Sequence, residues 1–303
     1  MGFIRQAVRT LPDGRTVLLH PFHISMEGLE SQILCRDESD YDYYVKDIFV
    51  CSLRCNVIVI MYAVVSNHAH IAVLAICAED AKKYGEEVKR IYGMYFSRKY
   101  GIQALESTDV DIQSLNDDQY VRNALAYIIR NALDNCNSIR EYKWTGFRAT
   151  FRKDPPTRCR LVKTLTVRET KAIFHTHQNL KSVPWLINEN NELEPWGACD
   201  MWYLEEAFFN NEAFFMKTVG GVNMAAMEEK LVIAPRKMIL DNELLILANE
   251  TAQKWFSTPV SSLSVERKIN LVTFLSHTQH TTISQLARVI GLPKERVAAI
   301  LSR

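Results

Sequence analysis

Two apolar runs flank a short polar turn in residues 56–76, which read NVIVIMYAVVSNHAHIAVLAI. The β-branched run Val57–Val65 is typical of a central strand that is buried on both faces. A second strand, His68–Ile76, is expected after the turn. The fold should therefore be built around a pair of adjacent strands in the middle of a sheet.

Two histidines lie at the start of the second of these strands. Side chains two residues apart in a strand project from the same face of the sheet. His68 and His70 should therefore face the same way, while Ala69 faces the other side. Two imidazoles in this arrangement could hold one divalent cation, but a pair alone makes a weak site, and the plainer interpretation is a pair of polar packing residues.

Length and composition place the chain among ordinary globular proteins. It has 303 residues, of which 48% are apolar and 23% charged, enough for a sizeable core and for two domains. Apolar runs of about 18 residues are absent, so no membrane span is expected. The polar start Met1–Arg15 does not resemble a signal peptide. Seven scattered cysteines without a Cys-x-x-Cys pair indicate a reduced, cytoplasmic protein rather than a cysteine-based zinc site.

The charge is uneven although the net charge is only +1. Residues 148–168 contain seven Lys or Arg against one acid, and residues 265–303 contain six against two. Such local basic segments can bind phosphate groups. They can equally be solvated surface, and the sequence leaves both interpretations open.

Hydrophobic periodicity predicts the order strand, helix, strand, strand, helix, and then a later helix. The expected elements are Thr16–Ser25, Asp37–Arg54, Val57–Val65, His68–Ile76, Ala78–Tyr100 and Gln119–Asn135. Gly101 is the expected C-cap of the long helix, and a polar, acidic loop is expected over Glu106–Asp118. This order favours an α+β fold with an antiparallel sheet and helices packed on it.

Three segments are expected along the chain. Residues 1–152 form the first domain, which the break Lys153-Asp154-Pro155-Pro156 ends. Residues 153–240 are mixed, mostly helical and of unknown role. Residues 241–303 end in the pattern helix, Gly-containing turn, helix over 282–301, which is typical of a helix-turn-helix DNA-binding domain or of a plain helical hairpin.

A second group of candidate site residues lies on the expected helix Gln119–Asn135. Tyr127 and Asn131 are four residues apart and share one helix face. A tyrosine can act as a covalent nucleophile. The amide oxygen of Asn131 suits a hard cation such as Mg²⁺ or Mn²⁺. Alternatively, Tyr127 is a helix residue with its hydroxyl at the surface, and Asn131 is a polar residue near a helix end.

Together these motifs resemble the single-tyrosine HUH transposases of small bacterial insertion sequences and of REP-associated repeats. The match consists of Asn67-His68-Ala69-His70 on a strand and Tyr-x-x-x-Asn, Tyr127 to Asn131, on a later helix. Further resemblance extends over 18–151 and lies in His23-Ile24-Ser25, Gly28, Asp40-Tyr41-Asp42-Tyr43-Tyr44 and Tyr142-Lys143-Trp144-Thr145-Gly146-Phe147-Arg148. The tail resembles the DNA-binding domain of the bacterial replication initiator.

The resemblance implies a ferredoxin-like HUH domain and a specific reaction. Tyr127 would attack single-stranded or hairpin DNA with an imperfect palindrome and form a 5′-phosphotyrosine. His68, His70 and Asn131 would bind Mg²⁺ or Mn²⁺. The protein would work as a monomer or homodimer, with the tyrosine helix serving its own subunit or a neighbour's.

Several residues differ from the pattern of the family. Val65-Ser66 stands where Met-Pro is usual, Ala69 is the small residue between the histidines, and Ala132 replaces the usual proline after Asn131. Two alternatives to a transposase follow. One is a domesticated, non-catalytic nucleic-acid-binding regulator on the same scaffold, and the other is a protein that acts on RNA.

Overall fold

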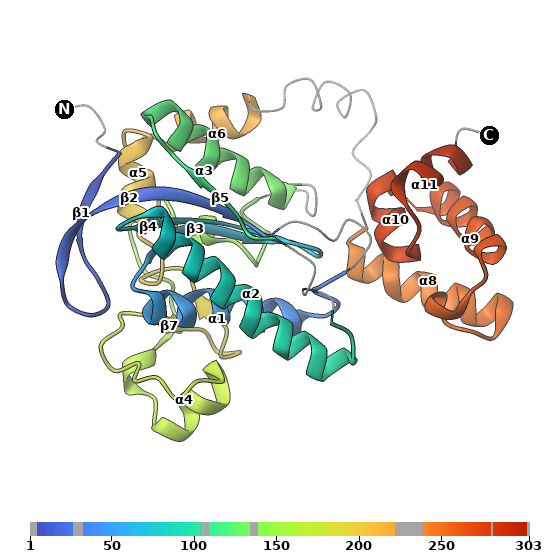
Figure 1. Ribbon diagram of the computed structural model, residues 1–303, viewed down its shortest axis with the longest axis horizontal. Helices are drawn as coiled ribbons and strands as arrows, with labels where there is room; N and C mark the ends of the chain where they lie inside the picture. The colour runs from blue at the N-terminus through green and yellow to red at the C-terminus, as the bar shows by residue number, and fades with distance from the viewer. Residues whose placement is uncertain are drawn as a thin grey trace.

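The computed structural model describes residues 5–26, 33–103, 105, 109–133, 139–221, 239–279 and 281–301. Figure 1 shows a sheet with helices on both faces and, beside it, a bundle of helices formed by the C-terminal part of the chain. The motif residue Gly28 lies outside the described residues.

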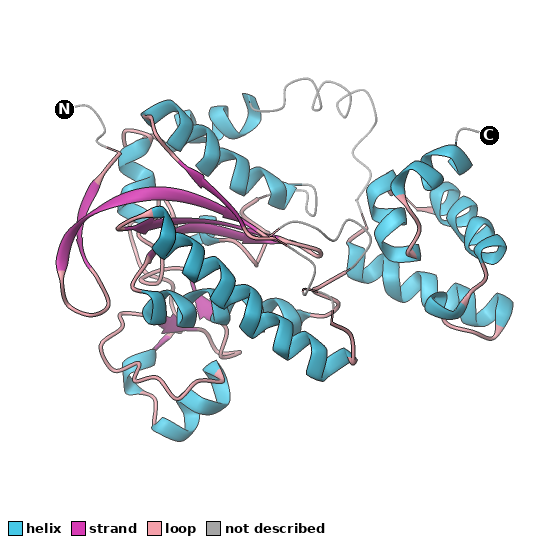
Figure 2. Cartoon of the chain, in the orientation of Figure 1, coloured by secondary structure: helices cyan, strands magenta, loops and turns pink. Residues whose placement is uncertain are grey.

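The main sheet is antiparallel throughout (Figure 2). Strand β2 (Thr16–Ser25) pairs along one edge with β4 (Ala69–Ala75), which pairs in turn with β3 (Ile58–Val64). The other edge of β2 is shared by β1 (Ala7–Thr10) on its first half and β5 (Asp111–Ser114) on its second half. The three strands expected around the apolar hairpin are confirmed, and the spatial order is β5-β2-β4-β3.

One face of the sheet is covered by the two helices expected from periodicity. They are α1 (Glu38–Cys55) and α2 (Ala78–Tyr100), and they pack against each other. Helix α1 begins with a capping box, in which the Asp37 side chain accepts from Asp40 N and the Asp40 carboxylate accepts from the Asp37 backbone. Gly101 ends α2 with φ at +69°, which confirms the expected C-cap.

The opposite face is covered by α3 (Asp118–Leu133), α5 (Met201–Ala207) and α6 (Glu212–Gly221). Leu125 and Ile129 of α3 are fully buried in a core shared with side chains of α5 and α6. The helix expected over Gln119–Asn135 is thus confirmed as far as Leu133, where the described part of α3 ends. Helix α3 lies directly over the sheet face toward which even-numbered residues of β4 point.

The edge of the sheet formed by β3 is covered by the segment 142–148, which is part of the family resemblance. The backbone N–H of Val64 donates to Trp144 O at 3.0 Å, and the Tyr142 hydroxyl donates to Val64 O at 2.7 Å. A 3₁₀ turn, η1 (Gly146–Ala149), follows. These contacts cover this half of the β3 edge. Its backbone N–H and C=O groups are therefore not open to pairing with a strand of another chain.

Residues beyond 152 pack on the same unit. A second small sheet consists of β6 (Arg160–Leu161), β7 (Leu186–Ile187) and β8 (Leu193–Glu194), and it lies with α4 (Val167–Phe174) beside α1. The short 3₁₀ turn η2 (Val162–Thr164) joins β6 to α4. The two hydrophobic cores around the main sheet therefore draw on residues from both sides of the position where a first domain is expected to end.

The C-terminal unit consists of four helices with a hydrophobic core of its own. These are α8 (Asp241–Phe256), α9 (Val265–Thr278), α10 (Ile283–Ile290) and α11 (Lys294–Leu301), with a 3₁₀ turn η3 (Val260–Ser262) after α8. Gly291, with φ at +66°, makes the turn between α10 and α11. The helices expected near the C-terminus are confirmed.

Two strands of the main sheet lie where the sequence does not predict them. Strand β1 lies in a polar segment, and β5 falls inside Glu106–Asp118, for which a loop is expected, so that expectation is wrong for 111–114. Both have only four residues and are largely exposed, so they lack the apolar alternation that indicates a strand. Within the described residues, no helix has the length and apolarity needed to cross a membrane.

Candidate active site

The two histidines of the central hairpin lie together at one end of the sheet. His70 is the second residue of β4 and is only 1% exposed, whereas His68 precedes the strand and is half-buried. Their ring centroids are 4.8 Å apart with the rings nearly perpendicular. The N–H of Val65 donates to His68 O at 2.9 Å and closes the turn that holds this arrangement.

Tyr127 of α3 packs against these rings. Its ring centroid lies 5.2 Å from that of His70 in an edge-on arrangement, and its side chain is 39% exposed. The hydrophobic residues around it on α3, including Leu125 and Ile128, are fully buried against the sheet. The anchoring of α3 thus holds the phenol at the rim of the histidine pair, accessible from outside.

Asn131 lies one helical turn beyond Tyr127 on the same face of α3. Its Nδ2 donates to the backbone oxygen of Tyr127 at 2.8 Å. This hydrogen bond directs the amide nitrogen back to the helix, so Oδ1 is the side-chain atom with which Asn131 could bind a cation. The structure thus brings His68, His70 and Tyr127 into one cluster and places Asn131 next to Tyr127 along the helix.

A third histidine joins the cluster. It belongs to His23-Ile24-Ser25, which the family resemblance includes without giving the histidine a role in the site. His23 of β2 is 6% exposed, and its Nε2 lies 3.2 Å from Nδ1 of His70. Its ring also meets Tyr127 edge-on, with centroids 6.1 Å apart. The contact arises from strand pairing, because Ser25 of β2 pairs with His70 and therefore sets His23 diagonally across from it on the same face.

The hydrogen bonds of the two expected histidine ligands fit cation binding. Nδ1 of His68 lies 3.0 Å from Oδ1 of Asn67, which can only accept, so His68 carries its proton on Nδ1 and its lone pair on Nε2. Nδ1 of His70 is bonded to His23, while its Nε2 is buried without a hydrogen-bond partner. A buried, unsatisfied polar atom costs about 1–3 kcal/mol, which a bound cation would remove.

The surroundings of His70 favour its neutral, metal-binding form. Burial lowers the pKa of His70 well below 6.5, and the nearby positive charges of His68 and His23 lower it further. Burial also lowers the pKa of His23. Neutral imidazole is the form that ligates metals. Across the described residues, no three His, Cys, Asp or Glu side chains are arranged to hold a metal, and the ligand set expected from the sequence has two imidazoles and one amide.

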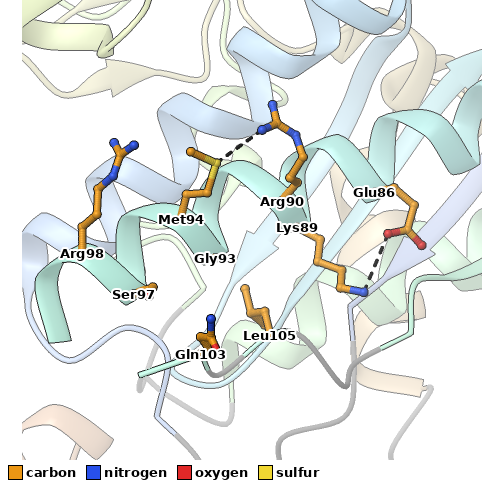
Figure 3. A pocket seen from close by; sticks show the side chains of 9 residues that line it. All are labelled: Glu86, Lys89, Arg90, Gly93, Met94, Ser97, Arg98, Gln103 and Leu105. Carbon is orange, nitrogen blue, oxygen red and sulfur yellow. Dashed lines mark hydrogen bonds and ion pairs between the residues drawn. The ribbon is translucent and has the colours of Figure 1, made fainter. Parts of the chain in front are cut away.

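Basic side chains also line α2, and several of them are paired with acids. A hollow of about 600 Å³ follows α2 on the face of the sheet opposite α3. Figure 3 shows Lys89 beside Glu86 and Arg90 beside Met94 along this helix. Lys99 is paired with Asp37 and Asp40. This hollow holds none of the site residues.

The basic segment at 148–168 is partly neutralised as well. Arg148 pairs with Glu194, and Arg160 pairs with Glu169. The C-terminal unit offers more accessible charge. Lys294 and Arg296 are exposed on α11, the second helix of the pair joined at Gly291.

The C-terminal unit contacts the turn that carries the histidines. The Ser66 hydroxyl donates to Oδ2 of Asp241, the first residue of α8, and Nε of Arg288 on α10 donates to the same oxygen at 2.8 Å. Ser66 and Asp241 are both 1% exposed. Ile33 of the first unit is buried in the core of the C-terminal helices. The candidate active site and the C-terminal helices are therefore joined by buried contacts.

Comparison of the chain with protein-family models, with curated proteins and with solved structures found no match.

Proposed function

We propose that this chain cleaves and rejoins single-stranded or hairpin DNA through a covalent bond to Tyr127. The observation that carries the proposal is the edge-on contact of the Tyr127 ring with the His70 ring. Nε2 of His70 is buried there without a hydrogen-bond partner and could bind a cation. The strand order β5-β2-β4-β3, with α1 and α2 on one face, supports a ferredoxin-like HUH domain. The sequence motifs of the single-tyrosine HUH transposases support the same assignment.

In the proposed reaction, the Tyr127 oxygen forms a bond to the phosphorus of a phosphodiester. The bond from phosphorus to the 3′ oxygen breaks, the phenol loses its proton, and the leaving strand ends in a 3′-hydroxyl. The reverse attack by a 3′-hydroxyl rejoins strands without an external energy source, because the phosphotyrosine conserves the bond. The exposure of Tyr127 would let a phosphate reach it.

His68, His70 and Asn131 would hold the Mg²⁺ or Mn²⁺. When bound, the cation would supply polarisation of the scissile phosphate and stabilisation of the charge on its oxygens. The residues of the chain orient this centre: Asn67 fixes the tautomer of His68, and burial keeps His70 neutral. The contact of Tyr127 with His70 of its own chain supports a tyrosine helix that serves its own subunit.

The test is formation of a covalent adduct on a denaturing gel. The full chain is incubated with a labelled single-stranded hairpin and Mn²⁺. The wild type should form an adduct and Tyr127→Phe should form none while still binding the hairpin. Tyr95→Phe is the control, because it removes a phenol hydroxyl on α2, which packs on the opposite face of the sheet. An adduct of equal yield in Tyr127→Phe would reject the proposal.

A second candidate function is a non-catalytic, nucleic-acid-binding regulator. The exposed Lys294 and Arg296 on α11 favour it independently of the active site. It predicts salt-sensitive DNA binding with no adduct in any divalent metal. The same gel therefore separates the two functions.

A further inference from the structure

A line of polar side chains crosses three strands and ends at His70. Gln113 of β5 pairs directly with His23 of β2, and Asp111 pairs with Ser25. His23 then reaches His70 of β4 through the 3.2 Å contact between Nε2 and Nδ1. A line of this kind can determine which nitrogen of His70 carries the proton.

Gln113 is itself held at the far end of this line. Nε2 of Gln113 donates to Oδ2 of Asp111 at 3.0 Å, and Oε1 of Gln113 accepts from the Tyr120 hydroxyl at 2.8 Å. Because cross-strand partners share a sheet face, these bonds hold the Gln113 side chain beside the imidazole of His23.

Cation binding at His70 requires one arrangement of protons across its contact with His23. A neutral imidazole has one donor and one acceptor nitrogen, so Nε2 of His70 can bind a cation only when the proton of His70 is on Nδ1. Nδ1 then donates to Nε2 of His23 across the 3.2 Å contact, and His23 is the acceptor. The lone pair of His70 then lies on Nε2, the buried atom without a partner.

We infer that His23, oriented by Gln113 and Asp111, is a positioning residue that fixes His70 as the Nδ1–H tautomer, with Nε2 available to a divalent cation. The inference rests on the proposed function for the identity of the ligand, a hard divalent cation. Partners of this kind orient ligating histidines, and their loss typically weakens metal affinity 10- to 100-fold. In this chain the partner is a second histidine rather than the more usual carboxylate or backbone oxygen.

A purely structural role for His23 makes a different prediction from a positioning role. His23→Leu keeps an apolar body between the sheet and α3 but removes the acceptor, while His23→Asn keeps a polar side chain that can accept from Nδ1 of His70. If His23 only fills space, leucine should serve at least as well as asparagine. If it positions His70, asparagine should restore what leucine loses.

The first measurement is Mn²⁺ affinity of the full chain, from the electron paramagnetic resonance signal of free Mn²⁺. His23→Leu should weaken binding about 10- to 100-fold, and His23→Asn should recover most of the loss. His20→Leu, which removes another imidazole from β2, is the matched control and should bind like the wild type. Wild-type affinity in His23→Leu, or equal losses in the leucine and asparagine variants, would overturn the inference.

The second measurement uses the wild type without metal, so it does not depend on whether a variant folds. Long-range ¹H–¹⁵N correlation spectra of the metal-free wild type report the tautomer of each histidine. His70 should be protonated on Nδ1, and a proton on Nε2 would overturn the inference. Should the wild type form no covalent adduct with DNA, the proposed function fails, while the tautomer of His70 still decides the role of His23.

Discussion

The ring of Tyr127 meets the ring of His70 edge-on, with 5.2 Å between their centroids, although the whole of α2 separates the two residues in the sequence. The contact exists because α3 lies across the same sheet face on which His70 projects. His23 and His68 also contact the His70 ring, so three imidazoles and one phenol form a single cluster. Chemistry at Tyr127 would depend on how firmly this cluster is held.

The buried histidines should make the protein less stable in mild acid. The pKa of His70 is well below 6.5 in the folded chain, and that of His23 is also lowered, both mainly because of burial. The unfolded chain therefore binds more protons below about pH 6.5, so the free energy of unfolding should fall by up to about 1.4 kcal/mol per pH unit for each such histidine.

Urea unfolding at pH 7.5, 6.5 and 5.5 measures this dependence. Stability should be highest at pH 7.5 and should decline toward pH 5.5, and His70→Leu should show a shallower decline than the wild type. His177→Leu removes an exposed histidine and should leave the slope unchanged. An identical slope in His70→Leu would contradict the burial of a neutral imidazole at this position.

The buried carboxylate of Asp241 should contribute strongly to stability. It accepts hydrogen bonds from Ser66 and Arg288, and its removal leaves both donors without this partner in a buried interface. Breaking a buried pair by removing one member typically costs about 3–5 kcal/mol. Asp241→Ala should therefore lower the urea concentration at the midpoint of unfolding, because it weakens the contact between the C-terminal helices and the sheet unit.

Asp13→Ala is the matched control for Asp241→Ala. Asp13 pairs with Arg15 at the surface, so its removal should change the unfolding midpoint little. Equal effects of the two substitutions would show that the buried contact between the two units does not exist in solution.

Two glycines of α2 should respond oppositely to alanine. A Cβ at Gly85 would lie 2.5 Å from Cγ1 of Val110 and 3.2 Å from Cγ2 of Ile24, whereas a Cβ at Gly93 would lie 3.6 Å from Leu105. Gly85→Ala should destabilise by about 1–3 kcal/mol through overpacking. Gly93→Ala should stabilise by up to about 1 kcal/mol through helix propensity. Thermal unfolding of both variants checks the pair, and stabilisation by Gly85→Ala would contradict the packing of α2 on β2.

The C-terminal helical unit should bind duplex DNA through α11. Lys294 and Arg296 are exposed there, and each phosphate that a cation neutralises contributes about 0.9 to the slope of log affinity against log salt. Replacing both with alanine should weaken binding and lower that slope by up to about two, as measured by fluorescence anisotropy. Lys254→Ala, at an exposed position of α8, should leave the slope as in the wild type. An unchanged slope in the double variant would exclude α11 as the DNA contact.

The centre of the fold was predictable because its signals are local. The β-branched run before the histidines and the helical spacing of α1 and α2 each identify an element without knowledge of its neighbours. Strands β1 and β5 escaped prediction because four exposed residues become a strand only by pairing with β2. The packing of α5 and α6 on α3 is likewise a tertiary contact, which local sequence patterns do not predict.

The candidate site was predictable in part for the same reason. The spacing of His68 and His70 and of Tyr127 and Asn131 follows from strand and helix periodicity. The place of His23 depends on the register between β2 and β4, which pairs Ser25 with His70. A single sequence does not contain that register. The signal available for His23 was its place in His23-Ile24-Ser25, a part of the family resemblance that assigned no role to this side chain.

The most direct measurement of the central claim is the identity of the residue that becomes linked to DNA. The wild-type chain is incubated with a hairpin and Mn²⁺, digested with nuclease and protease, and analysed by mass spectrometry. The account predicts one modified peptide, with a 5′-nucleotide phosphate on Tyr127. A phosphate on any other side chain, or a hairpin that is cut without any linked peptide, would contradict it.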